Sequence, residues 1–327
     1  MERLSYESAE TLVYDPVSAN RTATRAVLYT LGFRNIETVA SVEDFREAIH
    51  MRPPDLALCE AQGAATELCR MIQMLRQGAS GYNPFIVIIV TAWEKSNALV
   101  GRVVNSGADD LILRPFSTKL LGERIETHIE RRKGFVITHD YVGPDRRHDP
   151  SRASTVELFE PPNSLKMKAK ERLNAEEATA RLDAELRTAR DVLNTEKLRR
   201  DAFQICILWR LLQERRPSEQ STTEELTKLS HMTRAVGERC RETEFESAVG
   251  WCDSVLAAVE GLEQGVDRNA SMRLLGHAAL NLNQVFQPEM ATADQLSKID
   301  ATVAMIRARV QTKADASGAE LKMASGE

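Results

Sequence analysis

The sequence has few aromatic residues and no long hydrophobic run. Aromatic side chains make up 5% of its 327 residues, which is low for an all-β domain and favours helix-rich structure. The longest uninterrupted apolar stretch, residues 85–90 (FIVIIV), has the length of a strand. A membrane-spanning helix needs about 20 apolar residues, and the first ten residues contain no apolar signal-peptide core. We therefore expect a cytoplasmic protein with no membrane partner.

Paired cysteines and excess positive charge are also missing. The five cysteines, at positions 59, 69, 206, 240 and 252, are odd in number and form neither a CxxC pair nor a zinc-type spacing with histidine. We expect reduced, buried thiols. The formal net charge of −5 and the pI of about 5.8 argue against broad electrostatic binding to nucleic acid. We expect no nucleic-acid partner.

Residues 11–133 alternate short β-rich runs with amphipathic helical runs. The expected strands are 11–14, 35–40, 55–59, 85–90 and 110–113. The expected helices are 17–31, 42–51, 66–77, 97–107 and 118–132. The run 85–90 is apolar throughout, as is typical of a strand buried on both faces of a parallel sheet. The pattern predicts an α/β domain over residues 1–133, built on a five-stranded doubly wound parallel sheet.

Polar residues follow the expected strands at the points where the strands end. Asp15 follows the first strand, Glu60 the third, Thr91 the fourth and Arg114 the fifth. Ligand sites in such sheets form at the carboxyl ends of the strands, so we expect these four side chains to meet. Acids can hold a metal, while a hydroxyl and a guanidinium can bind phosphoryl oxygens. The set suits a phosphoryl group or a mimic of one.

Residues 11–133 resemble the receiver domain of bacterial two-component response regulators. Residues 53–60 (PPDLALCE) match the strand that carries the phosphoacceptor in that family. Residues 86–92 (IVIIVTA) match the strand that carries its switch threonine, here Thr91, and residues 106–117 (SGADDLILRPFS) match its last strand and basic-Pro-Phe turn. The resemblance implies a flavodoxin-like fold and a signalling role without enzymatic activity.

The departures from the family pattern concern the pocket itself. Glu60 stands in place of the phosphoacceptor aspartate, Tyr14 in place of one of two metal-binding acids, Arg114 in place of a lysine, and Leu111 in place of a common aromatic. The extra methylene moves the carboxylate about 1.5 Å outward, and a misplacement of about 1 Å can cost on the order of 10²-fold in rate. Phosphorylation should therefore be impaired.

Three interpretations of this pocket stay open. An arginine fork can hold a carboxylate with two hydrogen bonds, so Glu60 could pair with Arg114, beside Thr91 and Asp15, and mimic a phosphorylated state. Alternatively, the pocket is a degenerate relic. In the third interpretation it still accepts phosphate or binds another regulator, with a weakened Mg²⁺ site at Asp15 and Glu60. We otherwise expect no metal and no cofactor.

The rest of the chain divides into three stretches. Residues 134–163 are rich in proline and mixed charge and predict a linker; within it, residues 141–147 (YVGPDRR) resemble a tag of bacterial signalling proteins. Residues 164–311 predict an all-α module, with a short coiled-coil seam at Leu182, Leu186, Ala189 and Leu193 and a helical bundle. Residues 312–327 predict a disordered tail.

These features together predict an atypical response regulator. Its receiver would act through phosphate-independent or phosphomimetic protein–protein interaction, and its helical module would serve dimerisation or output. Candidate partners are a histidine kinase, a phosphotransfer protein or a second copy of the chain. The alternatives are a conventional phosphorelay regulator that is still phosphorylated, and a structural adaptor that uses the receiver as a dimer interface.

Overall fold

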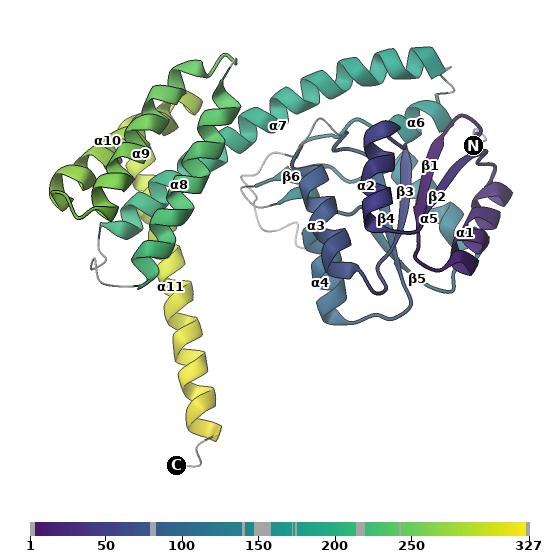
Figure 1. Ribbon diagram of the computed structural model, residues 1–327, viewed down its shortest axis with the longest axis horizontal. Helices are drawn as coiled ribbons and strands as arrows, with labels where there is room; N and C mark the ends of the chain where they lie inside the picture. Colours follow the sequence, from purple (N-terminus) through teal and green to yellow (C-terminus); the bar gives the residue numbers. More distant parts are fainter. Residues whose placement is uncertain are drawn as a thin grey trace. The chain divides into compact units, whose positions relative to one another are not determined.

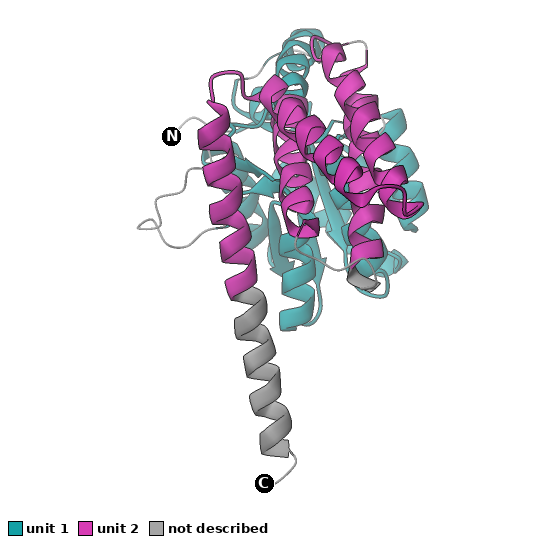
Figure 2. Ribbon diagram, turned by 90° about the vertical axis from the view of Figure 1, so that its left-hand side faces the viewer, with its two compact units in different colours: residues 1–193 teal, residues 194–327 magenta. Residues whose placement is uncertain are grey.

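The chain forms two compact units, Met1–Leu193 (unit 1) and Asn194–Glu327 (unit 2), shown in different colours in Figure 2. The computed structural model describes residues 4–78, 83–138, 141–146, 158–171, 173, 175–213, 220–241 and 243–324. Among these residues, no helix combines the length and the apolar character needed to cross a membrane. Each unit has hydrophobic cores of its own.

Unit 1 is built on a five-stranded parallel sheet with the strand order β2-β1-β3-β4-β5. This is the flavodoxin-like doubly wound order, and it confirms the predicted fold class. The strands are β1 (Glu10–Tyr14), β2 (Asn35–Val39), β3 (Leu56–Glu60), β4 (Val87–Ala92) and β5 (Asp110–Leu113). Every residue of β3 and β4 is buried, as expected for central strands covered on both faces.

Helices cover both faces of this sheet (Figure 1). The apolar sides of α2, α3 and α4 form one core with the sheet, and α1 and α5 form the core on the opposite face. These helices are α1 (Ser18–Leu31), α2 (Val42–Met51), α3 (Ala65–Arg76), α4 (Asn97–Ser106) and α5 (Thr118–Glu130). Serine hydroxyls at positions 41, 96 and 117 cap the amino ends of α2, α4 and α5, so these helix starts are encoded locally.

The segment predicted as a linker, 134–163, is partly folded. Strands β6 (Phe135–Ile137) and β7 (Val142–Pro144) pair antiparallel, and Phe159 forms an isolated bridge to Phe135. Strands of three residues leave no periodic pattern to read in a sequence, which is why composition alone suggested a linker. Residues 147–157 of the predicted linker, including Arg147 of the tag, lie outside the described residues.

The predicted coiled-coil seam is covered by the chain itself. Helix α6 (Ser164–Ala169) and the first part of α7 (Ala175–Leu212) belong to unit 1. Leu186, Ala189 and Leu193 are buried in one cluster with Phe85, Phe135, Ile137 and Val142, against which Leu182 is also packed. The heptad spacing marks an apolar stripe without specifying what covers it, and in this structure residues of the same unit cover it.

Unit 2 is all-helical, as predicted. Its core combines the second part of α7 with α8 (Gln220–Cys240), α9 (Val249–Glu263), α10 (Arg268–Phe286) and α11 (Thr292–Ala324). The apolar run 203–212 is buried in this core and does not form an exposed partner surface. The stretch predicted as a disordered tail, 312–327, is helical as far as Ala324, and residues 325–327 lie outside the described residues.

Candidate functional site

The four predicted site residues meet at the carboxyl edge of the sheet. Glu60 ends β3 and lies opposite Thr91 of β4 in the parallel register. Asp15 follows β1, and Arg114 follows β5. Asp15, Glu60 and Thr91 are fully buried or nearly so, and the side chain of Arg114 is only 7% exposed. Strand order alone therefore brings together residues that lie up to 99 positions apart in the chain.

One carboxylate oxygen of Glu60 receives two hydrogen bonds. Thr91 Oγ1 donates to Glu60 Oε2 at 2.7 Å, and Arg114 Nε donates to the same oxygen at 2.7 Å. The other oxygen, Oε1, accepts the backbone N–H of Gln62 at 3.0 Å. The contact expected between Glu60 and Arg114 is thus present, and both oxygens of the buried carboxylate are satisfied.

Arg114 also connects this carboxylate to the first strand and helix. Its Nη2 lies 3.2 Å from Asp15 Oδ2 and donates to Thr24 Oγ1 at 3.1 Å. The guanidinium carbon lies 4.9 Å from the ring centroid of Phe116, within cation–π range. Sequence reasoning missed Thr24; the signal that could have found it is a polar residue on the buried face of α1.

The two acids that could bind a metal contact other groups, although Asp15 Oδ2 is buried and accepts no hydrogen bond. Asp15 Oδ1 accepts the backbone N–H of Val17 at 2.8 Å, while Arg114 lies against both Asp15 and Glu60. Tyr14 is buried beside Phe45, and burial raises the pKa of its phenol. Among the described residues, no three carboxylate, histidine or cysteine side chains are grouped as metal ligands. The guanidinium of Arg114 thus lies within 3.2 Å of a carboxylate oxygen of each acid.

A second buried polar cluster, which the sequence did not reveal, lies at the opposite ends of the strands. Arg76 Nη2 donates to Asp109 Oδ2 at 2.8 Å and Arg132 Nε to Asp109 Oδ1 at 2.9 Å. Burial favours the neutral form of Asp109, but the adjacent Arg132 and Arg76 outweigh it and hold the pKa of this carboxyl below its usual value. The cluster joins α3, the start of β5 and the end of α5.

Comparison with known proteins bears on unit 1 alone. No family model matches the chain. The N-terminal region is similar to solved receiver domains. A CheY-like response regulator receiver domain protein from Methanospirillum hungatei shares 21% identity over 38% of this chain and 95% of that chain, with a TM-score of 0.34. An orphan response regulator of H. pylori shares 24% identity over 38% and 98% of the two chains, with a TM-score of 0.31.

A response regulator from Thermotoga maritima shares 21% identity over 36% of this chain and 96% of that chain, with a TM-score of 0.32. The fold of unit 1 is shown by the strand order of its sheet.

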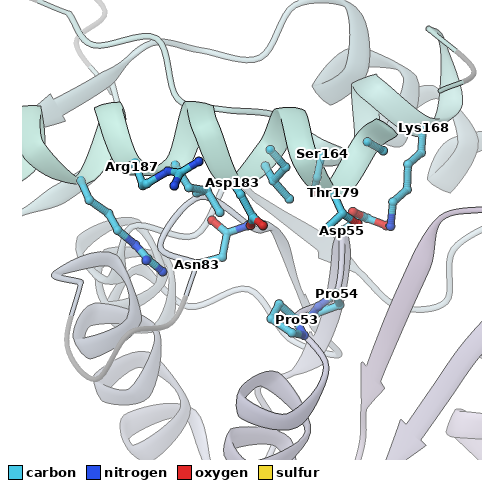
Figure 3. Close-up of a pocket in the computed structure, with 13 residues that line it drawn as sticks. Pro53, Pro54, Asp55, Asn83, Ser164, Lys168, Thr179, Asp183 and Arg187 are labelled. Atoms are coloured by element: carbon cyan, nitrogen blue, oxygen red, sulfur yellow. The ribbon is translucent and has the colours of Figure 1, made fainter. Parts of the chain in front are cut away.

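A separate groove opens at the amino-terminal edge of the sheet (Figure 3). It has a volume of about 560 Å³, and residues from the start of β3, from α6 and from α7 line it. Lys168 and Asp55, which point toward each other in the close-up, form an ion pair of 2.8 Å in its wall. None of the predicted site residues lines this groove.

The cysteines and two histidines have structural surroundings. All five cysteines are buried and free of disulfides, as predicted, and burial raises the pKa of Cys206 to about 12. Such thiols are poor nucleophiles at neutral pH. His277 packs edge-on against Trp251, and His231 is exposed on α8.

Proposed function

We propose that the chain is an atypical cytoplasmic response regulator whose receiver-like unit is held in a phosphorylated-like arrangement by Glu60. In this proposal the unit presents a fixed surface to a protein partner and needs no phosphoryl group. The hydrogen bonds that Thr91 and Arg114 both donate to Glu60 Oε2 carry the proposal. A hydroxyl and a cation that converge on one oxygen would serve a phosphoryl group in the same way.

The length of the glutamate side chain explains why phosphate is unnecessary. An aspartate at the end of β3 would place its carboxylate about 1.5 Å further from Thr91 and Arg114, and a phosphoryl group would be needed to bridge that distance. Glutamate spans it directly. Burial strengthens the attraction between the two charges but also costs desolvation, so each charge depends on the other to remain buried.

The helical unit supports a role in output or dimerisation. Its core is continuous from the second part of α7 to α11, so it has the apolar packing of an independent domain. We propose a histidine kinase, a phosphotransfer protein or a second copy of this chain as the partner. We propose no enzymatic activity, because the buried pocket holds neither an accessible nucleophile nor an unpaired base among its described residues.

Two other functions compete with this proposal. A conventional phosphorelay regulator would accept phosphate on Glu60 or on another acid. A structural adaptor would use the receiver-like fold as a dimer interface, with no role for the pocket. Each of these two functions predicts a different effect of substitutions at Glu60 on phosphorylation and partner binding from the one that our proposal predicts.

The deciding experiment treats the full-length wild type and Glu60→Asp with a small phosphodonor and Mg²⁺ and measures intact mass. We expect no adduct on the wild type and one phosphoryl group on Glu60→Asp. Glu67→Asp, on α3 outside the pocket, controls for adventitious modification. A phosphorylated wild type would support the conventional regulator. If both stay unmodified, Glu60→Ala decides: unchanged partner binding supports the adaptor, and lost binding supports the phosphomimic.

A further inference from the structure

The tag that the sequence singled out contacts the end of α4 within unit 1 by close backbone approach. Gly143 of β7 lies against Gly107, which ends α4 with a φ of 86°. A Cβ at Gly107 would lie 2.4 Å from the carbonyl oxygen of Val142, and a Cβ at Gly143 would lie 2.7 Å from Gly107 Cα. Real side chains do not fit at such distances, so two glycines make this approach possible.

Polar contacts fix the same segment. Arg146 Nη2 donates to the carbonyl oxygens of Ala108 and, at 3.1 Å, Asp109. Tyr141 closes the turn by donating its hydroxyl to the carbonyl of Pro144 at 2.8 Å. Residues 141–146, which we call the clasp, are thereby held on the turn between α4 and β5.

The clasp is next to the buried cluster around Asp109, because Arg146 donates to the carbonyl oxygen of that residue. Besides the two arginines, Asp109 Oδ2 accepts the backbone N–H of Ile88 at 2.8 Å. The guanidinium carbons of Arg76 and Arg132 lie 5.2 and 5.0 Å from the ring centroid of Phe135 on β6. The charged cluster therefore contacts the hairpin through Phe135, and it also connects the sheet to α3 through Arg76.

The outer side of the hairpin is apolar and is occupied by α7. Val142 of the clasp, together with Phe85 and Phe135, contributes to the cluster that buries Leu186 and Leu193. Phe85 packs against the ring of Phe135 at 6.0 Å. Leu186 and Leu193 belong to the seam, whose heptad spacing is typical of pairing between helices.

We propose that the β6–β7 hairpin, held in place by the clasp, is together with Phe85 an intramolecular dock for the seam of α7, and that docking keeps this seam from pairing with a second chain. The seam spans about two heptads, fewer than the three or four that sustain a coiled coil. Within one chain the effective concentration of the dock is on the order of millimolar. The intramolecular contact thus prevails while the clasp is in place, and loss of the clasp frees the seam.

Hydrogen exchange on the full-length chain tests the first half of this proposal. Arg146→Ala removes two hydrogen bonds of the clasp, and Gly143→Ala forces its backbone away from Gly107. We expect exchange over residues 182–193 to accelerate about tenfold or more in each variant, with β1 unchanged. Arg70→Ala, an exposed arginine on α3, and Gly101→Ala, with open space around its Cβ, are matched controls and should leave exchange at wild-type rates. Unchanged exchange over 182–193 in both clasp variants overturns the proposal.

Sedimentation tests the second part of the proposal, that docking keeps the seam from pairing with a second chain. We expect Arg146→Ala and Gly143→Ala to self-associate more strongly than wild type, and Leu186→Lys in the same chain to reverse the increase. Two outcomes would overturn the claim that docking competes with pairing. One is wild-type association that Leu186→Lys abolishes, since the seam would then already be free. The other is a clasp variant with rapid exchange over 182–193 and no gain in association.

Discussion

Glu60 is one methylene longer than an aspartate, and the pocket depends on that length. Its carboxylate reaches both the hydroxyl of Thr91 and the guanidinium of Arg114. Arg114 in turn reaches Asp15, so a single cation serves two buried acids. The arrangement of the pocket depends on Arg114 as much as on Glu60, because a lysine would offer a point charge in place of a planar fork with several donors.

Arg114→Ala should leave two buried carboxylates without a cation. We expect the free energy of unfolding of unit 1 to fall by about 3–5 kcal/mol, the usual cost of breaking a buried ion pair. Arg114→Lys retains the charge and should cost clearly less. Urea unfolding of the two variants measures the difference. Equal losses would show that the fork geometry, and not the charge, stabilises the pocket.

Lys197 on α7 makes the stability of unit 2 depend on pH. Burial, and then the nearby Arg239, lowers the pKa of Lys197 from 10.5 to about 8. Between these two values the unfolded chain binds more protons than the folded chain, so stability rises with pH in that window. Below pH 8 both states are protonated, and the folded state carries the full cost of the buried charge.

Lys197→Met should therefore stabilise unit 2 by about 1–3 kcal/mol at pH 7. The gain should shrink as pH rises from 8 toward 10.5, where the wild-type folded state no longer holds the charge. Urea unfolding at pH 7 and pH 10 measures both effects, and Lys228→Met, at an exposed position on α8, is the control. A gain that is the same at both pH values would contradict the assignment.

At the scale of elements, periodicity predicted the five helices that cover the sheet, α1 to α5, to within two residues at either end, because caps and amphipathic faces are local signals. The fourth strand was placed at 85–90 and is observed at Val87–Ala92. Phe85 is instead packed in the cluster with the hairpin and α7. The apolar run was correctly interpreted as buried, but which of its residues enter the ladder depends on the partner strands.

Helix α10 approaches α7 closely at one glycine. A Cβ at Gly276 would lie 2.5 Å from Cζ2 of Trp209, and an indole ring cannot bend away as a flexible chain can. We expect Gly276→Ala to destabilise unit 2 by about 1–3 kcal/mol through overpacking. Thermal unfolding followed by tryptophan emission measures the loss.

Gly250→Ala is the matched control on α9. Nothing lies within 4 Å of its added Cβ, so helix propensity should stabilise this variant by up to about 1 kcal/mol. Destabilisation by both substitutions would mean that the contact with Trp209 is not the cause.

At the scale of the whole molecule, each hydrophobic core is built from buried residues of one unit only. One core draws its buried residues from Leu198 to Val303, and the others draw theirs from Ala9 to Leu193. Units with separate cores are expected to unfold in separate transitions. Trp93 lies in unit 1, whereas Trp209 and Trp251 lie in unit 2.

A Trp93→Phe chain should report the unfolding of unit 2 alone. In that background we expect Gly276→Ala to lower the urea midpoint and Arg114→Ala to leave it unchanged. Circular dichroism on the same samples should show the loss of unit 1 as a transition at a different midpoint. Equal shifts of both transitions by Arg114→Ala would show that the two units unfold as one.

Sequence patterns alone predicted the α/β order of unit 1, the helical character of unit 2 and the four side chains that meet at the carboxyl edge of the sheet. These follow from period, strand ends and residue type, which are local properties. Their meeting could be predicted because parallel strands present their carboxyl ends at one edge. Thr24 was missed because its place on the buried face of α1 marks a polar residue but does not show that Arg114 will donate to it.

What covers the seam of α7 depends on the tertiary structure. A heptad stripe requires an apolar partner but does not name it, and here Val142 and Phe135 of the same chain supply it. The contact of Gly107 with Gly143 likewise joins segments whose pairing no local pattern encodes. Long-range contacts are selected by packing and by the absence of side chains that would clash, and both exist only once the chain has folded.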